Sequence, residues 1–185
     1  DSAHTTRAQE LETPAEVITT ATTSDFTATL TDKSEPAQLY YTSGTTGSPK
    51  GVVLTHENVC THALAAVKEL DLNKHDTWAH IAPMFHLADA WATFAITAVH
   101  GSHVFLPQFT PQSALDLLRD ERVTITNLIP TMLNLMVKEP DAADREYSLR
   151  VMLSGGSPIA PEVVNSILKT FSCDYVQTYG MTETS

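Results

Sequence analysis

Three glycines, several hydroxyl side chains and one lysine gather in residues 41–51, between two apolar runs. Glycine permits positive φ and lets backbone amides approach a ligand closely, and successive amides form a concave site for an anion. Lys50 adds a point charge. The composition therefore predicts a phosphate-binding loop, and a flexible Ser/Thr/Gly hairpin is the alternative. The loop residues proposed to contact phosphate are Thr42, Ser43, Gly44, Thr45, Thr46, Gly47 and Lys50.

This loop differs from the P-loop of nucleoside triphosphatases. In that motif the second glycine comes five residues after the first and is followed directly by Lys and then Ser or Thr. Here Pro49 stands five residues after Gly44, and Gly51 follows Lys50. This loop would therefore bind phosphate with a geometry that differs from that of a P-loop.

Residues 177–183 follow another apolar run and combine an aromatic ring, a hydroxyl and a carboxylate. The ring of Tyr179 could stack on a base, and Thr182 could donate to a phosphate oxygen. Glu183 could hold Mg²⁺, which commonly takes one or two carboxylates together with substrate phosphates. Read alone, the segment could equally be an exposed turn with a solvated glutamate.

Two further segments follow strand-like runs. Gly155 and Gly156 have no side chains, so a flat ring or an acyl chain could lie on their backbone. A plain strand-to-helix turn is the alternative. His86 begins an apolar helical stretch after Pro83, where a lone histidine could be merely structural.

In this order, the four segments resemble motifs of the adenylate-forming (AMP-binding) superfamily. The superfamily includes acyl-CoA and aryl-CoA synthetases, firefly luciferase-like enzymes and peptide-synthetase adenylation domains. Residues 42–51 resemble its phosphate-loop signature, and residues 82–87 (Ala-Pro-Met-Phe-His-Leu) resemble its substrate-side motif. Residues 153–158 resemble its Gly-Gly-Ala/Ser-Pro segment, and residues 177–183 resemble its Tyr-Gly-x-Thr-Glu motif.

The resemblance implies ligands for these residues. It implies adenine stacking for Tyr179, an α-phosphate contact for Thr182 and Mg²⁺ at Glu183, and it places His86 near the substrate carboxylate. The implied catalytic residues are Thr182, Glu183, Lys50 and His86. The implied nucleotide contacts outside the loop are Gly155, Gly156, Ser157, Tyr179, Gly180, Met181 and Thr182.

Differences within the motifs indicate a branch. Peptide-synthetase adenylation domains usually have Ser at Thr45, Pro at Met181 and Asp at His86, where the Asp holds a substrate amino group. The resemblance therefore favours a carboxylic acid–CoA ligase that uses ATP, Mg²⁺ and coenzyme A on a fatty or similar acid. The acid-pocket candidates are small or apolar, as such an acid requires: Ala82, Met84, Leu87, Trp91, Gly156 and Met181.

Two other functions stay open. One is a non-catalytic nucleotide-binding or interaction module, and the other is a different adenylate-forming enzyme, such as a 4-coumarate-type ligase, a luciferase-like enzyme or a peptide-synthetase adenylation domain. Family members are several hundred residues longer than this chain. We therefore expect an internal fragment of the large N-terminal domain that does not complete the reaction alone.

The elements that must position these motifs follow from the hydrophobic pattern. Apolar runs predict strands, and stretches with helical spacing lie between most of them; an example is Val59, Ala63, Val67 and Leu70. Thr110-Pro111 and Pro161 mark helix starts, and a third helix is expected over about 87–99, ending at Gly101. The pattern predicts an α/β fold with a mostly parallel sheet flanked by helices. The expected strands cover 38–42, 51–54, 77–82, 103–106, 124–128, 150–153 and 175–178.

Ligands of such sheets bind beyond the carboxyl ends of the strands, where the motifs lie. Of the remaining charged and titratable residues, little is expected. His100 and His103 flank Gly101, which breaks the helix that would put them on one face. No zinc site is predicted, because no spacing typical of metal ligands relates the other histidines considered to one another or to Cys60: His56, His62, His75 and His80. Asp116, Arg119 and Asp120 are expected to form a solvated helix face with Glu121 and Arg122.

Composition limits the partners. The 185 residues include 22 acidic and 11 basic side chains, a formal net charge of −11, which argues against nucleic acid or an anionic membrane. No apolar run is long enough to span a bilayer, and Cys60 and Cys173 suggest a reducing compartment such as the cytoplasm. The expected partners are a small carboxylic acid, ATP and CoA. Residues 1–36 are read as an acidic, Thr-rich lead-in with one or two short strands, and residues 37–185 as part of the AMP-binding domain.

Overall fold

The computed structural model describes residues 31–44 and 47–184, and residues 32–185 form one compact unit. Most of the predicted lead-in segment therefore lies outside the described residues. No helix among the described residues is long and apolar enough to cross a membrane. The elements are β1 (Pro36–Thr42), β2 (Lys50–Thr55), α2 (His56–Glu69), β3 (Thr77–His80), α3 (Leu87–Ala98), β4 (Ser102–Phe105), α4 (Pro111–Asp120), β5 (Ile125–Leu128), α5 (Pro130–Met136), η1 (Ala142–Asp144), β6 (Val151–Ser154), α6 (Pro161–Phe171), β7 (Asp174–Gln177) and η2 (Thr182–Thr184).

Five strands form a parallel sheet in the order β4-β3-β5-β6-β7, which confirms the predicted α/β class. The register pairs Trp78 with Ile125, and Asn127 with Leu153. Among the described residues, the strands β1 and β2 pair only with each other, as a separate antiparallel hairpin. The phosphate-loop candidate is thus the connection of a hairpin, and it does not follow a strand of the main sheet.

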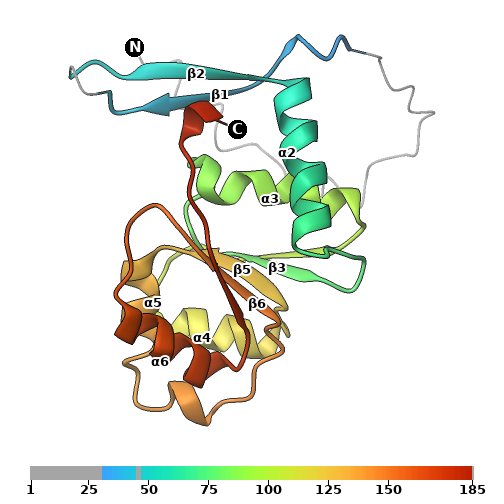
Figure 1. Cartoon of the computed structure of the whole chain (residues 1–185). Helices are drawn as coiled ribbons and strands as arrows, with labels where there is room; N and C mark the ends of the chain where they lie inside the picture. Colours follow the sequence, from blue (N-terminus) through green and yellow to red (C-terminus); the bar gives the residue numbers. More distant parts are fainter. Residues whose placement is uncertain (1–30, 45–46, 185) are drawn as a thin grey trace, which may run out of the picture. The chain divides into compact units, whose positions relative to one another are not determined.

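Helices cover both faces of this sheet (Figure 1). Successive side chains of a strand point to opposite faces. Trp78 accordingly packs with α2 and α3, whereas its neighbour Ala79 packs with α4, α5 and α6. Met152 and Leu153 of β6 divide in the same way. Burial on both sides explains why the strands read as continuous apolar runs.

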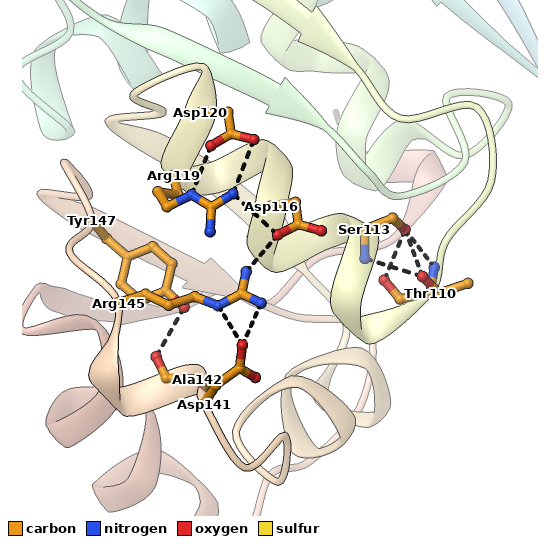
Figure 2. Close-up of polar contacts among 9 residues, drawn as sticks. All are labelled: Thr110, Ser113, Asp116, Arg119, Asp120, Asp141, Ala142, Arg145 and Tyr147. Carbon is orange, nitrogen blue, oxygen red and sulfur yellow. Dashed lines mark hydrogen bonds and ion pairs between the residues drawn. The ribbon is translucent and has the colours of Figure 1, made fainter.

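The helix starts follow the predicted signals. Thr110 accepts a hydrogen bond from the Ser113 amide at 3.1 Å, and Pro111 occupies the first turn of α4 (Figure 2). Helix α3 ends at Ala98, shortly before Gly101, where a side chain would crowd Asp76 and Ile96. The sequence pattern missed α5, because its seven residues are too few to show a helical period.

Arg145 fastens the segment after η1 to α4 (Figure 2). Its guanidinium donates to Asp141 at 2.7 Å and to Asp116 at 2.8 Å, and its side chain is only 7% exposed. On the same helix, Arg119 contacts both Asp116 and Asp120. The charged face of α4 is thus largely exposed, as expected, but it also serves as the docking site of Arg145, which the spacing along α4 could not indicate.

The ion pair between Asp76 and Arg150 ties together the amino ends of β3, β5 and β6. Arg150 Nη2 lies 2.7 Å and Nε 2.8 Å from the carboxylate, and Thr124 Oγ1 donates to it at 2.7 Å. Burial would raise the pKa of Asp76. The hydrogen bonds from Arg150, the Asn73 amide and Thr124 outweigh burial and hold that pKa below its usual value. The carboxylate is only 2% exposed.

Removing the arginine of this pair should destabilise the protein strongly. Arg150→Met leaves a buried carboxylate without its counter-charge, and the free energy of unfolding should fall by about 3 kcal/mol. The matched control is Arg119→Met, which breaks two exposed ion pairs and should lower the free energy of unfolding far less. Urea unfolding measures both. Equal losses for the two variants would contradict a special role for the Asp76 pair.

Candidate active site

Three of the four sequence motifs lie at one edge of the parallel sheet. Residues 82–87 come shortly after β3, residues 155–158 directly after β6 and residues 178–183 directly after β7. Because the strands are parallel, their carboxyl ends share that edge. This is where open α/β sheets bind their ligands.

The fourth motif connects β1 to β2. Gly44 and Gly47 have φ values of 64° and 84°, in the left-handed region that favours glycine. A side chain at Gly44 would also overlap the carbonyl oxygen of Ser48. Lys50 is exposed and pairs with Thr42 at the end of the hairpin. The loop thus has the tight, glycine-dependent turn that a cradle of amides requires; Thr45 and Thr46 lie outside the described residues.

The short helix η2 brings the predicted Thr182 and Glu183 to this hairpin. It lies against β2, and Figure 1 shows the chain running from β7 up to the hairpin. Its start is braced by Thr184, whose hydroxyl accepts from the Met181 amide at 3.1 Å. Glu183 is exposed, and Tyr179 is 95% exposed. The tertiary structure thus places a lysine, a glycine turn, a threonine and a carboxylate in neighbouring segments.

Gly155 is required by a contact inside the protein. The Thr178 amide donates to the Ser154 carbonyl at 2.7 Å, and the Thr178 hydroxyl donates to it at 3.1 Å. A side chain at Gly155 would overlap that hydroxyl. Gly156, with φ of 80°, and Ser157 are exposed. The room that two glycines were expected to leave for a ligand therefore lies at Gly156, whereas Gly155 permits the close approach of residue 178.

His86 stands at the start of α3. It is exposed, its ring lies 4.5 Å from that of Phe85, and it makes no side-chain hydrogen bond to the helix end. Of the predicted acid-pocket residues, Leu87 and Trp91 line a small pocket together with residues of β1 and α2. The others are not part of its lining. The complete lining is Gln38, Val59, His62, Leu87, Trp91 and Phe94.

Asn127 was missed by the sequence analysis. It is the third residue of β5, which lies between β3 and β6, and its amide nitrogen is 2.5 Å from the Ala88 carbonyl. Its side-chain oxygen is buried without a hydrogen-bond partner among the described residues. One signal was present, since Asn127 is a polar residue in a strand that begins and ends with apolar residues. The structure makes it an anchor for the first turn of α3.

Comparison with known proteins identifies the family. A family model described as AMP-binding enzyme matches residues 2–185. The chain belongs to this AMP-binding family. It is 38% identical over 151 residues to 2-succinylbenzoate–CoA ligase of Bacillus licheniformis, a match that covers 81% of this chain and 31% of that protein. It is 37% identical over 147 residues to the long-chain-fatty-acid–CoA ligase FadD13 of Mycobacterium tuberculosis, a match that covers 78% of this chain and 29% of that protein.

Solved structures agree with the family assignment. The inhibitor-bound N-terminal domain of FACL13 from Mycobacterium tuberculosis matches with a TM-score of 0.81 and 30% identity, over 91% of this chain and 42% of that one. O-succinylbenzoate coenzyme A synthetase from Bacillus subtilis, in complex with ATP and magnesium ion, matches with a TM-score of 0.74 and 30% identity. This match covers 82% of this chain and 31% of that one. The AMP-binding chain thus spans less than a third of the length of the curated relatives named above.

Proposed function

We propose that the protein containing this chain is an ATP-dependent carboxylic acid–CoA ligase. The observation that supports this most is the packing of η2, with Thr182 and Glu183, against β2, the strand that leaves the glycine loop. The helix η2 follows β7, at the carboxyl edge of the parallel sheet. The relatives named above are CoA ligases, and one related structure holds ATP and magnesium ion.

In the first step, a carboxylate oxygen of the acid attacks the α-phosphorus of ATP, and pyrophosphate leaves. Two anions must meet, so the protein has to offset negative charge and align the reactants. The loop amides and Lys50 would hold the β- and γ-phosphates, and Thr182 would donate to the α-phosphate. Glu183 would hold Mg²⁺, which supplies positive charge to the phosphates when bound. The exposed Tyr179 would stack on adenine.

In the second step, the CoA sulfur attacks the acyl carbonyl carbon, the thiol loses its proton, and AMP leaves with the electron pair of the broken C–O bond. The acid itself would lie at the amino end of α3. His86 would stand near its carboxylate, and the apolar Leu87 would contact its body. Phe85 and His86 offer no carboxylate to hold a substrate amino group. We therefore propose a fatty or similar apolar acid as substrate.

Acid-dependent exchange of labelled pyrophosphate into ATP tests this proposal in the full-length protein. A panel of fatty, cinnamate-like and amino acids is added one at a time, and CoA thioesters are identified by mass. We expect exchange with at least one acid that lacks an amino group, followed by its thioester when CoA is present. MgATP binding without exchange for any acid would instead support a non-catalytic module. Exchange with amino acids alone would support an adenylation domain.

A further inference from the structure

Four side chains that the motifs do not include form a continuous hydrogen-bonded chain. His80 Nδ1 lies 2.7 Å from Asp89 Oδ2, and His80 Nε2 lies 3.0 Å from His103 Nδ1. His103 Nε2 in turn lies 3.1 Å from the hydroxyl of Thr97. His80 and Asp89 are almost completely buried, whereas Thr97 is exposed. The chain therefore leads from a buried carboxylate to the surface.

The donors in this chain can be assigned from chemistry. An ionised carboxylate only accepts, so His80 Nδ1 donates its proton to Asp89. A neutral His80 must then accept at Nε2, which requires His103 to carry its proton on Nδ1. His103 Nε2 accepts from the Thr97 hydroxyl. With both rings neutral, every hydrogen bond in this series therefore has one donor and one acceptor.

One added proton on His80 can exchange the donor and acceptor roles in the bonds of His103 without moving a heavy atom. A charged His80 donates from Nε2 to His103 Nδ1, and His103 then donates from Nε2 to Thr97. A second proton does not fit, because two charged rings would point N–H groups at each other across 3.0 Å. The pair of histidines can therefore bind one proton, whereas two isolated histidines would bind two.

The surroundings favour a single proton. Asp89 lies in the first turn of α3, where the helix dipole favours a negative charge, and its other oxygen accepts from Trp78 Nε1 at 3.1 Å. The ring of Phe105 stacks on His80. Burial and the charge of His80 lower the pKa of His103, and Asp89 raises it less. From the neighbouring β5, Asn127 reaches the first turn of α3, and its amide does not titrate.

The hydrogen bonds of Asp89 also hold the start of α3 in place. The amides of Asp89 and Ala90 both donate to the His86 carbonyl at 3.2 Å. The bonds from His80 and Trp78 hold the Asp89 side chain against β3. His80 thereby holds the turn that begins at His86.

We propose that Asp89, His80, His103 and Thr97 form a one-proton relay in which His80 is the positioning residue for the first turn of α3. Two substitutions separate its two bonds. His80→Asn places an amide near the Nδ1 position and keeps a donor for Asp89, but it cuts the link to His103. His80→Gln places its amide near the Nε2 position and keeps that link, but it leaves Asp89 Oδ2 without a donor.

Two measurements on the full-length protein test the relay, and neither uses a substrate. Nitrogen-15 NMR of labelled histidines should show His103 protonated on Nδ1 at neutral pH, and His80 and His103 together should never carry more than one added proton at any pH from 8 to 5. Amide hydrogen exchange at Asp89 and Ala90 should accelerate at least tenfold in His80→Gln. It should change less than threefold in His80→Asn and in the control His75→Gln, at an exposed histidine.

In His80→Asn, the pKa of His103 should rise, because the charge of His80 no longer lowers it, whereas burial should still hold it below its usual value. The proposal is overturned if wild-type His103 carries its proton on Nε2, if the pair gains two protons, or if His80→Gln leaves exchange at the start of α3 unchanged. The wild-type spectrum decides the first two points even where a variant fails to fold.

Discussion

Replacing Glu183 by glutamine is expected to lower kcat/KM for acid activation in the full-length protein by about 100- to 1000-fold, the usual cost of removing one electrostatic contact to a transition state. The amide keeps the shape of the side chain but loses its negative charge. Glu183 is exposed at the short helix beside β2, so it can supply one carboxylate to Mg²⁺ while phosphates and water complete the ligands. Pyrophosphate exchange over a range of Mg²⁺ concentrations measures the effect.

Excess Mg²⁺ should restore part of the activity, because weaker metal binding is the cause of the loss. The matched control is Glu162→Gln, at an exposed position on α6, which should change kcat/KM less than twofold. Normal turnover by Glu183→Gln would remove Glu183 from the proposed metal site.

Replacing Gly155 by alanine is expected to weaken MgATP binding at least tenfold, or about 1.4 kcal/mol. The new methyl group would overlap the Thr178 hydroxyl and lie 3.0 Å from the Thr178 carbonyl oxygen. The end of β7 must then move away from β6, and residues 179–183 move with it. Calorimetric titration of MgATP into the full-length protein measures this loss.

A second substitution tests the cause. Thr178→Ala alone removes one hydrogen bond to Ser154 and keeps the backbone bond between the same residues, so its effect should be small. Combined with Gly155→Ala, it removes the worst overlap and should recover part of the lost affinity. Wild-type affinity in Gly155→Ala, or no recovery in the double variant, would show that the contact between residues 155 and 178 does not position the nucleotide site.

The secondary structure was largely predictable because its signals are local. Apolar runs indicated all seven strands of the part of the chain that the structure describes, to within two residues at every end. Proline and capping hydroxyls indicated where α4 and α6 begin. Alternation of strands with helices implied a parallel sheet, and in a parallel sheet the motifs after strands must share an edge. Helix α5, at seven residues, was too short to be predicted.

The partners of individual side chains were not predictable in the same way. His80 and His103 are 23 residues apart and have no informative spacing, yet they are hydrogen-bonded because β3 and β4 are neighbours in register. Asn127 reaches Ala88 only because β5 lies next to β3. Arg145 reaches α4 across 29 residues. Each contact depends on strand order or on how a loop folds back.

Sequence patterns predicted most of the elements, the fold class and the four motifs, because periodicity, turn residues and glycine requirements act between near neighbours in the chain. Only packing in three dimensions showed that the glycine loop belongs to a separate hairpin, that η2 packs against that hairpin, and that His80 bonds both to a buried carboxylate and to His103. These outcomes depend on which faces bury each other, and that is settled by the packing of the whole unit.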